Sequence, residues 1–343
     1  MVQATPPSSL LRAVLPLVLV VFSACTAPSS AMDCDPGDRA ALLRVKAQLG
    51  GPARLSSWLP STNCCAWGPA VFCDAGGRVT ALALFALGDE LSARVPPALG
   101  DLAALQILQV QSVPGLSGPV PASFRNLTRL RDLDINGTSI SGPVPAALLA
   151  GAAGLRTLAI ANSKLAGPVP AALAALPRLR YLDLSGNLLT GAIPPGLVHG
   201  SSGFLILAGN DLTGEVPAGY GGLDTLDLSH NRLAGDPSAA LFGIAGPAAK
   251  IDLSWNALAF DMTRVAFPHH LRLLDLSHNR ITGSVAKSLR DVALRRLDVS
   301  YNELCGEIPA GRFMAAHGAE AYAHNRCLCG APLPPCNGTG GLG

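Results

Sequence analysis

A regularly spaced set of aspartates offers the clearest chemistry in this sequence. The set comprises Asp134, Asp183, Asp227, Asp252, Asp275 and Asp298, and its last four members recur at intervals of 25, 23 and 23 residues, each between two apolar residues. If the fold stacks these positions at strand spacing, about 4.8 Å, the like charges repel unless a cation or a basic partner offsets them. We therefore expect these aspartates to form a binding surface for a basic partner; a solvated role within each copy is the alternative.

A second set is basic, and each member directly follows the first apolar residue of a copy. It consists of Arg131, Arg156, Arg180, Arg272 and Arg295. Guanidinium groups in such a row can either offset the aspartates or contact a polyanion. Phe204, Trp255 and Tyr301 are predicted to lie on the same face, where exposed aromatic residues are typical anchors of protein interfaces.

The sequence contains little that would support a catalytic site or a metal site. His230 and His278 hold equivalent places in two copies, as repetition alone predicts, and no motif supplies a nucleophile or an acidic partner. The aspartates face an open surface without a pocket to raise one pKa, as glycoside hydrolysis would need. Cys327 and Cys329 are close together, but no CxxC pair or matched histidine accompanies them. We expect no enzyme activity, no cofactor and no metal.

The elements that position these residues are short repeated strands. The phrase LxLxxN occurs six times, and its asparagines are Asn187, Asn210, Asn231, Asn256, Asn279 and Asn302. Apolar residues that alternate with outward positions predict a strand, and the asparagine can turn inward to bond unpaired backbone groups. A period near 23 residues is that of a leucine-rich repeat. About ten copies are predicted over residues 79–310.

Glycine and proline follow the asparagine turn in most copies, as in GPVP at 118–121 and GEIP at 306–309. Glycine allows close backbone approach, and proline is tolerated where its missing donor is not needed. This variant resembles the plant extracellular class of leucine-rich repeat. The predicted fold is an α/β leucine-rich-repeat solenoid, a right-handed superhelix of about ten plant-type repeats with a parallel concave sheet and disulfide-bonded N- and C-terminal caps.

The ends of the chain predict secretion. Residues 1–31 have one basic residue ahead of a short apolar run and then small residues, which is typical of a signal peptide, and no second long apolar run follows. We expect a secreted protein without a membrane anchor. Asn126, Asn136 and Asn337 begin glycosylation sequons, which suits that route. Scattered basic residues, 25 against 23 acidic ones, make nucleic acid an unexpected partner.

Two groups of four cysteines bracket the repeats. Residues 32–78 hold Cys34, Cys64, Cys65 and Cys73, while Cys305, Cys327, Cys329 and Cys336 lie at the other end, mostly in the cap and tail at 311–343. Solenoid ends expose apolar faces that need caps, and disulfides can clamp short capping modules in an oxidising compartment. Each group of four permits three pairings.

Three stretches resemble one family, the polygalacturonase-inhibiting proteins. They are the N-terminal DRAALLRVKAQLG with NCCAWGPAVFCD, the irregular DPSAALFGIAGPAAKIDLSWNALAFDMTRV, and the C-terminal LCGEIPAGRFMAAHGAEAYAHNRCLCGAPLPPC. The resemblance covers nearly the whole mature chain. It implies the disulfides Cys34 to Cys64, Cys65 to Cys73, Cys305 to Cys327 and Cys329 to Cys336.

The same resemblance implies a function. We expect a secreted cell-wall inhibitor, a monomer, that binds endopolygalacturonases of fungi or insects through its concave face and occludes them in plant defence. Departures in the sixth copy and an alanine-rich surface bear on which enzymes it recognises. Two alternatives remain open: a soluble receptor-like module that binds a peptide or a receptor kinase, and a wall protein that binds pectin through the arginine row.

Overall fold

The computed structural model describes residues 33–198, 203–218, 220, 223–241, 249–311 and 313–336. The chain divides into two units, Met1–Met32 and Asp33–Gly343, and every described residue lies in the second. The predicted signal peptide and the sequon at Asn337 lie outside the described residues. No described helix has the length and apolar character needed to cross a membrane.

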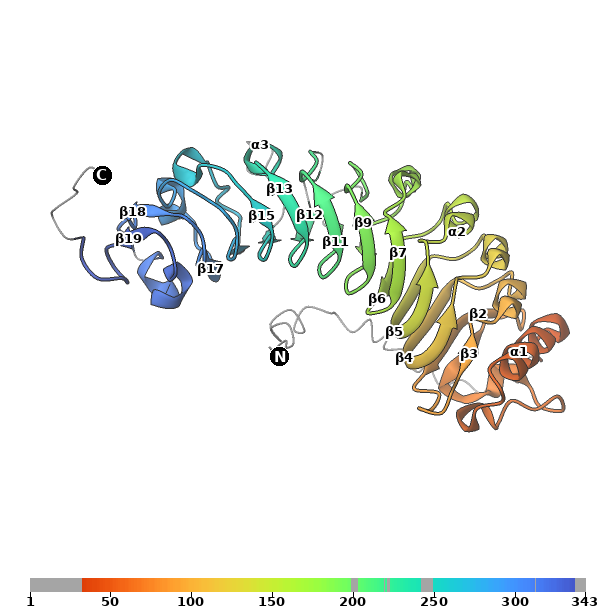
Figure 1. The fold of residues 1–343 in the computed structure, drawn as a ribbon. Helices are drawn as coiled ribbons and strands as arrows, with labels where there is room; N and C mark the ends of the chain where they lie inside the picture. Colours follow the sequence, from red (N-terminus) through yellow and green to blue (C-terminus); the bar gives the residue numbers. More distant parts are fainter. Residues whose placement is uncertain are drawn as a thin grey trace. The chain divides into compact units, whose positions relative to one another are not determined.

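Asp33–Gly343 is a leucine-rich-repeat solenoid whose principal sheet gains one strand from each repeat (Figure 1). The strands pair in parallel register, except that the first is antiparallel to the second. In spatial order they are β1 Val71–Cys73, β2 Val79–Phe85, β4 Ile107–Gly118, β5 Asp132–Gly142, β6 Thr157–Ala161, β8 Tyr181–Asp183, β10 Gly203–Ile206, β12 Leu223–Asp227, β14 Lys250–Asp252, β16 Leu273–Asp275 and β17 Arg296–Asp298.

The inward leucines of these strands form one continuous core. Leu226 and Leu228 in the copy that holds Asp227 are essentially inaccessible, as are Leu274 and Leu276 two repeats later. Burying each such side chain stabilises the fold by about 1.5–3 kcal/mol. The expected inward and outward register of the strands is therefore confirmed.

Shorter strands, and in most of the described repeats 3-10 turns, follow the strands of the principal sheet. After the asparagine, short strands pair in parallel, and several 3-10 turns then begin directly after a proline, among them Pro96, Pro121 and Pro170. Proline is tolerated at a helix start because its missing donor would be unpaired there. These elements are β3 Ala93–Arg94, β7 Lys164–Pro168, β9 Leu188–Gly191, β11 Asp211–Gly214, β13 Arg232–Gly235, β15 Ala257–Leu258, η5 Pro97–Asp101, η6 Ala122–Asn126, η7 Ala171–Ala175, η8 Met262–Arg264 and η9 Lys287–Asp291, with helices α2 Ala146–Gly151 and α3 Ser238–Leu241.

The repeated asparagines tie successive repeats together. Asn279 Nδ2 donates to the carbonyls of Leu253 and Leu276 at 3.0 and 3.1 Å, while its Oδ1 accepts from the Leu258 N–H at 3.0 Å. The same pattern continues beyond the predicted repeats to Asn325 inside the C-terminal cap. This copy was not predicted, although the string AHN at 323–325 resembles the SHN of earlier repeats.

The N-terminal cap is anchored to the first repeat by helix α1 Pro36–Gln48. Asp35 caps that helix by accepting from the N–H groups of Gly37 and Asp38. Asp38 is buried and pairs with the Arg78 guanidinium at 2.8 Å while accepting from the Val79 N–H. Trp58 and Trp67 are buried within this cap, and their rings stack with centroids 5.1 Å apart.

Both caps carry the disulfides that the family resemblance implies, Cys34–Cys64, Cys65–Cys73, Cys305–Cys327 and Cys329–Cys336. At the C-terminal end, β18 Cys305–Glu307 pairs with β19 Cys327–Cys329, and η10 Ala315–His317 and η11 Ala319–Tyr322 lie between the two strands in the sequence. The disulfide prediction is confirmed. The residue boundaries assigned to the caps and repeats stay predictions.

Candidate functional site

The aspartate row forms as predicted in its C-terminal half. The strand register places Asp227, Asp252, Asp275 and Asp298 directly beside one another on successive strands. Earlier in the sheet the row is interrupted: Ile206 separates Asp183 from Asp227, and Ala159 separates Asp134 from Asp183. The sheet therefore presents one contiguous acidic row of four residues and two outlying aspartates.

These carboxylates are more buried than a solvated row would be. Asp227 and Asp275 are only 3% and 5% exposed, and Asp183 is 7% exposed. In each of these and in Asp252 and Asp298, Oδ1 accepts from the N–H and hydroxyl of the serine two residues later. Ser229 is itself buried, and its hydroxyl donates to Oδ1 of Asp227 at 2.7 Å. One oxygen of each carboxylate is thus committed within the repeat.

Burial disfavours the charged form of the row. It raises the pKa of Asp134, Asp183, Asp227 and Asp298, and it raises the pKa of Asp252 to about 7 with help from the neighbouring charges of Asp227 and Asp275. The serine bonds act in the opposite direction and are outweighed. At neutral pH the net negative charge of the row is therefore smaller than the number of its carboxyl groups. A cationic partner would favour ionisation of the groups that are still protonated.

An arginine outside the predicted basic row offsets part of the acidic charge. Arg296 reaches Oδ2 of Asp275 at 3.1 Å and Oδ2 of Asp298 at 3.8 Å. The predicted row does not do this: all five of its arginines are exposed, and within the described chain none forms an ion pair. Arg296 was missed because it stands one place after Arg295, where the preceding repeat has an apolar Leu273.

The predicted aromatic residues fall in two separate places. Phe204 lies on β10 beside Tyr181 of β8, with ring centroids 5.6 Å apart. Trp255 and Tyr301 instead lie three residues after an aspartate, at the strand end, where they are 50% and 45% exposed. The aspartate row thus has an aromatic pair on one side and exposed rings on the other.

Trp255 and Tyr301 belong to a ladder of stacked rings that sequence reasoning missed. The ring ladder consists of His230, Trp255, His278, Tyr301 and His324, with successive centroids 5.4, 3.7, 4.0 and 4.1 Å apart. Every member has a positive φ between 52° and 56°. The position before the asparagine is left-handed in other repeats too, where Gly186 and Gly209 occupy it. The equivalence of His230 and His278 was the available signal, but it was interpreted only as duplication.

The remaining predicted sites among the described residues can also be placed in the structure. Asn126 ends η6 and is exposed, whereas Asn136 lies within β5 and accepts from Asn162 at 3.1 Å. The sulfur atoms of Cys34, Cys64 and Cys65 cluster, but all three are in disulfides and so are not thiolate ligands. Within the described chain this cluster is the only metal-like grouping.

Comparison with known proteins agrees with this architecture. Residues 35–74 match the leucine rich repeat N-terminal domain, and residues 178–199 and 267–289 each match a leucine rich repeat. Among solved structures, a plant ice-binding protein superposes with a TM-score of 0.84 at 38% identity, over 90% of this chain and 100% of that one. The ectodomain of a receptor kinase from Arabidopsis thaliana superposes with a TM-score of 0.65 at 28% identity, over 76% of this chain and 32% of that one.

Full-length relatives decide the family. Polygalacturonase inhibitor 1 of Oryza sativa subsp. japonica is 45% identical over 322 residues, which cover 93% of this chain and 96% of the relative. The polygalacturonase inhibitor of Vitis vinifera is 40% identical over 93% of this chain and 96% of its own length. A shared repeat alone does not explain these two matches, because each alignment covers 93% of the chain and so includes the caps as well as the repeats. The chain belongs to the polygalacturonase inhibitor family.

Proposed function

We propose that this protein binds endopolygalacturonases of fungi or insects in the plant cell wall and inhibits them by occlusion. The observation that carries the proposal is the 45% identity to a polygalacturonase inhibitor over nearly the full length of both chains. The relatives are named as inhibitors, and the contiguous acidic row supports a role in recognition. Secretion, action as a monomer and the absence of enzyme activity are parts of this proposal.

The mechanism follows from charge complementarity. An enzyme that hydrolyses a polymer of galacturonate needs a basic cleft, and the contiguous aspartates can meet the rim of that cleft as the polyanion would. Serine holds Oδ1 of each carboxylate, and Arg296 pairs with Oδ2 of Asp275 and Asp298. A partner would therefore meet Oδ2 of Asp227 and Asp252 first. The exposed rings of Trp255 and Tyr301 next to the row supply apolar contact area.

Proton release should accompany binding. Asp252 has a pKa of about 7, so a fraction of it is protonated near neutrality. A cation brought close to the row lowers that pKa and favours the ionised form. Affinity should therefore rise as pH increases from 5 to 7.5, and calorimetry in two buffers of different ionisation enthalpy should detect the released protons.

The test compares charge removal inside and outside the row. Replacing Asp227 and Asp252 by asparagine keeps the oxygen that accepts from serine but removes the charge, and should weaken inhibition at least tenfold, about 1.4 kcal/mol. The charge-matched control replaces the exposed Asp224 and Asp236 by asparagine. Inhibition is measured by release of reducing ends with a panel of fungal endopolygalacturonases. If both double variants inhibit like the parent, the aspartate row is not the recognition surface.

The exposed arginines favour pectin as a further ligand. Arg131, Arg156 and Arg180 lie on three successive repeats, and the N–H of each later one donates to the carbonyl of the one before at 2.7 and 2.9 Å. A row of unpaired guanidinium groups suits a linear polycarboxylate. Replacing all three by alanine should reduce retention on immobilised polygalacturonate while inhibition of the enzyme changes less. Unchanged retention would exclude the row as the pectin site.

A further inference from the structure

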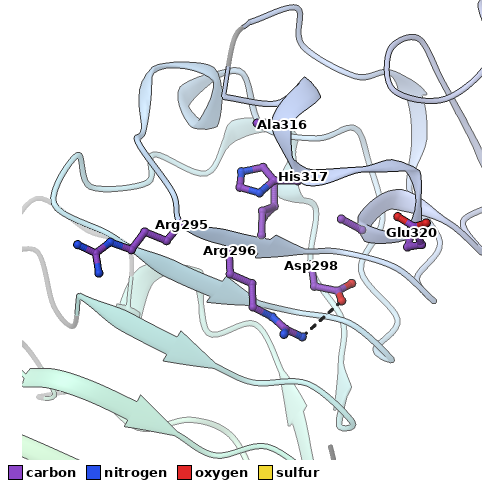
Figure 2. A pocket seen from close by; sticks show the side chains of 8 residues that line it. Arg295, Arg296, Asp298, Ala316, His317 and Glu320 are labelled. Atoms are coloured by element: carbon purple, nitrogen blue, oxygen red, sulfur yellow. Dashed lines mark ion pairs between the residues drawn. The ribbon is translucent and has the colours of Figure 1, made fainter. Parts of the chain in front are cut away.

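A pocket lies at the last strand of the principal sheet, where the repeats give way to the C-terminal cap. Its volume is about 310 Å³, and Figure 2 shows the side chains that line it. It is bounded by β17 on one side and by η10 and η11 on the other, and its lining residues are Arg295, Arg296, Leu297, Asp298, Ala316, His317, Glu320 and Ala321. This volume is at the lower end for ligand sites, which suits a short peptide segment rather than a larger molecule.

A backbone hydrogen bond that recurs along the sheet is missing at this pocket. The carbonyl of Arg131 accepts from the N–H of Arg156 at 2.7 Å, and that of Arg272 accepts from Arg295 at 2.7 Å. The equivalent carbonyls of Gln106, Arg156, Arg180 and Ala249 are satisfied in the same way. Among the described residues, the carbonyl of Arg295 accepts no such bond.

The strand register indicates that the backbone N–H and carbonyl of Leu297 also face the pocket. In a parallel ladder, alternate residues direct both backbone groups to the same neighbouring strand. Asp298 bonds toward β16, because its carbonyl accepts from the Leu276 N–H at 2.8 Å. Leu297 must then direct its N–H and carbonyl away from β16, toward the side on which the pocket lies.

The cap explains why no strand covers this edge. Pairing resumes directly beyond it, where the N–H of Val299 donates to the carbonyl of Ala321 at 2.8 Å and Tyr301 to Ala323 at 3.0 Å. Counting back from that register, residues 318–320 would lie beside 295–297. Instead Gly318, with φ 71°, turns the chain into η11. A gap about three residues long, roughly 10 Å, is left open at the sheet edge.

The side chains around the gap carry complementary charge at its two ends. Arg295 and Glu320 are both exposed. Within the described residues, neither side chain forms an ion pair. Figure 2 shows them on opposite sides of the pocket, with the Arg296 and Asp298 pair between them. His317 adds a buried Nε2 without a hydrogen-bond partner in the described chain.

We propose that this gap binds a short extended peptide segment of a partner protein, which adds a strand to the edge of β17. The main chain of the segment would bond the Leu297 N–H and carbonyl and the Arg295 carbonyl, as in other cases of strand addition. Its acidic side chain would face Arg295 and its basic side chain would face Glu320. The site is separate from the contiguous aspartates proposed to meet the enzyme, apart from Asp298, which belongs to both.

The experiment uses the whole mature protein, labelled with 15N, and two blocked tripeptides, acetyl-Glu-Val-Lys-amide and acetyl-Lys-Val-Glu-amide. Titration should shift the Leu297 amide resonance with one of the two orders, and that order fixes the direction of the added strand. The same peptide with an N-methylated valine should bind at least tenfold more weakly. If neither peptide moves the Leu297 resonance at millimolar concentration, the proposal is overturned.

Matched variants separate this site from general surface charge. Arg295→Ala and Glu320→Gln should each weaken the peptide at least fivefold. Arg272→Ala removes the equivalent exposed arginine one repeat earlier, where the carbonyl is already satisfied, and should have no effect. Equal weakening by all three variants, or an N-methylated peptide that binds as tightly as the parent peptide, contradicts strand addition. Unchanged inhibition of a polygalacturonase by Arg295→Ala would show that the two sites act separately.

Discussion

At the scale of single residues, the same aspartate serves the fold and the surface. In the row, the serine two places on holds one carboxylate oxygen, and the repeat packs the rest of the group closely enough to raise its pKa. Bonds from a hydroxyl and an N–H normally lower a carboxyl pKa, so the upward direction shows that desolvation is the larger effect here. Binding strength and folding stability should therefore both depend on pH through these groups.

The pH dependence of stability can be assigned to Asp252. Its folded pKa of about 7 lies above the unfolded value of about 3.9. The protonated form is thus favoured by folding: the stabilisation is fully present below pH 4 and is lost as pH rises through 7. Linkage sets the loss on the order of 2–4 kcal/mol. In Asp252→Asn, urea unfolding between pH 4 and 7.5 should show a correspondingly flatter profile.

Asp224→Asn is the control for this measurement, because Asp224 is an exposed residue of the same face in the preceding repeat. Its pH profile should overlay that of the parent. A parent whose unfolding free energy does not fall between pH 4 and 7.5 relative to Asp252→Asn would show that burial does not control this carboxyl group.

At the scale of elements, the ring ladder presents a balance of opposing effects. A left-handed backbone costs a non-glycine residue about 1–2 kcal/mol, and glycine takes this position elsewhere in the chain. Each ring stack returns about 0.5–1.5 kcal/mol, and Trp255 makes two of them, with His230 and His278. The two effects nearly cancel. Stability alone therefore gives little reason for rings at this position, and their exposure favours a role in contact with a partner.

Replacing Trp255 by glycine tests this balance. The strain and the stacking are lost together, so the free energy of unfolding should change by no more than about 1 kcal/mol. Inhibition of a sensitive polygalacturonase should fall at least tenfold if the ring is an interface anchor. Trp58→Gly provides the contrast, because Trp58 is fully buried in the N-terminal cap and its loss should be strongly destabilising. A strongly destabilised Trp255→Gly with normal inhibition would place the ladder in the fold instead.

At the scale of the whole molecule, the repeats depend on their ends. Every repeat buries its leucines against two neighbours, but the first and last have one neighbour each and rely on the caps. The C-terminal cap is the less regular of the two. It resumes backbone pairing at Ala321 and continues the asparagine ladder to Asn325, but before Ala321 it leaves the edge of β17 open.

Disulfide removal should reveal how much each cap depends on its bridges. Cys34 and Cys64 are 30 residues apart, whereas Cys329 and Cys336 are 7 apart. Loop-closure entropy then predicts losses of roughly 3.6 and 2.4 kcal/mol for the two double serine variants. Equilibrium unfolding of each variant measures the difference. A larger loss for the Cys329 and Cys336 pair would show that native contacts in the cap outweigh chain entropy.

The sequence by itself determined the repeat, its register and the caps. Strict alternation around each LxL and a fixed period force leucines inward and stack equivalent positions, so the aspartate row could be predicted residue by residue. The disulfides also followed, but only from the family resemblance. All of these depend on patterns that recur at constant spacing, which a single sequence displays directly.

Only the tertiary structure decided how these groups behave. Sequence spacing does not report how deeply a side chain is buried. In the sheet, Ser229 donates a hydrogen bond to Asp227, and burial raises the pKa of Asp252 to about 7. Asp275 pairs with Arg296 and not with an arginine of the predicted row, because only the three-dimensional positions of the guanidinium groups decide which one reaches the carboxylate. The ring ladder and the open edge at Leu297 likewise arise because the stack brings residues from separate repeats within a few ångströms, while the cap departs from it at Gly318.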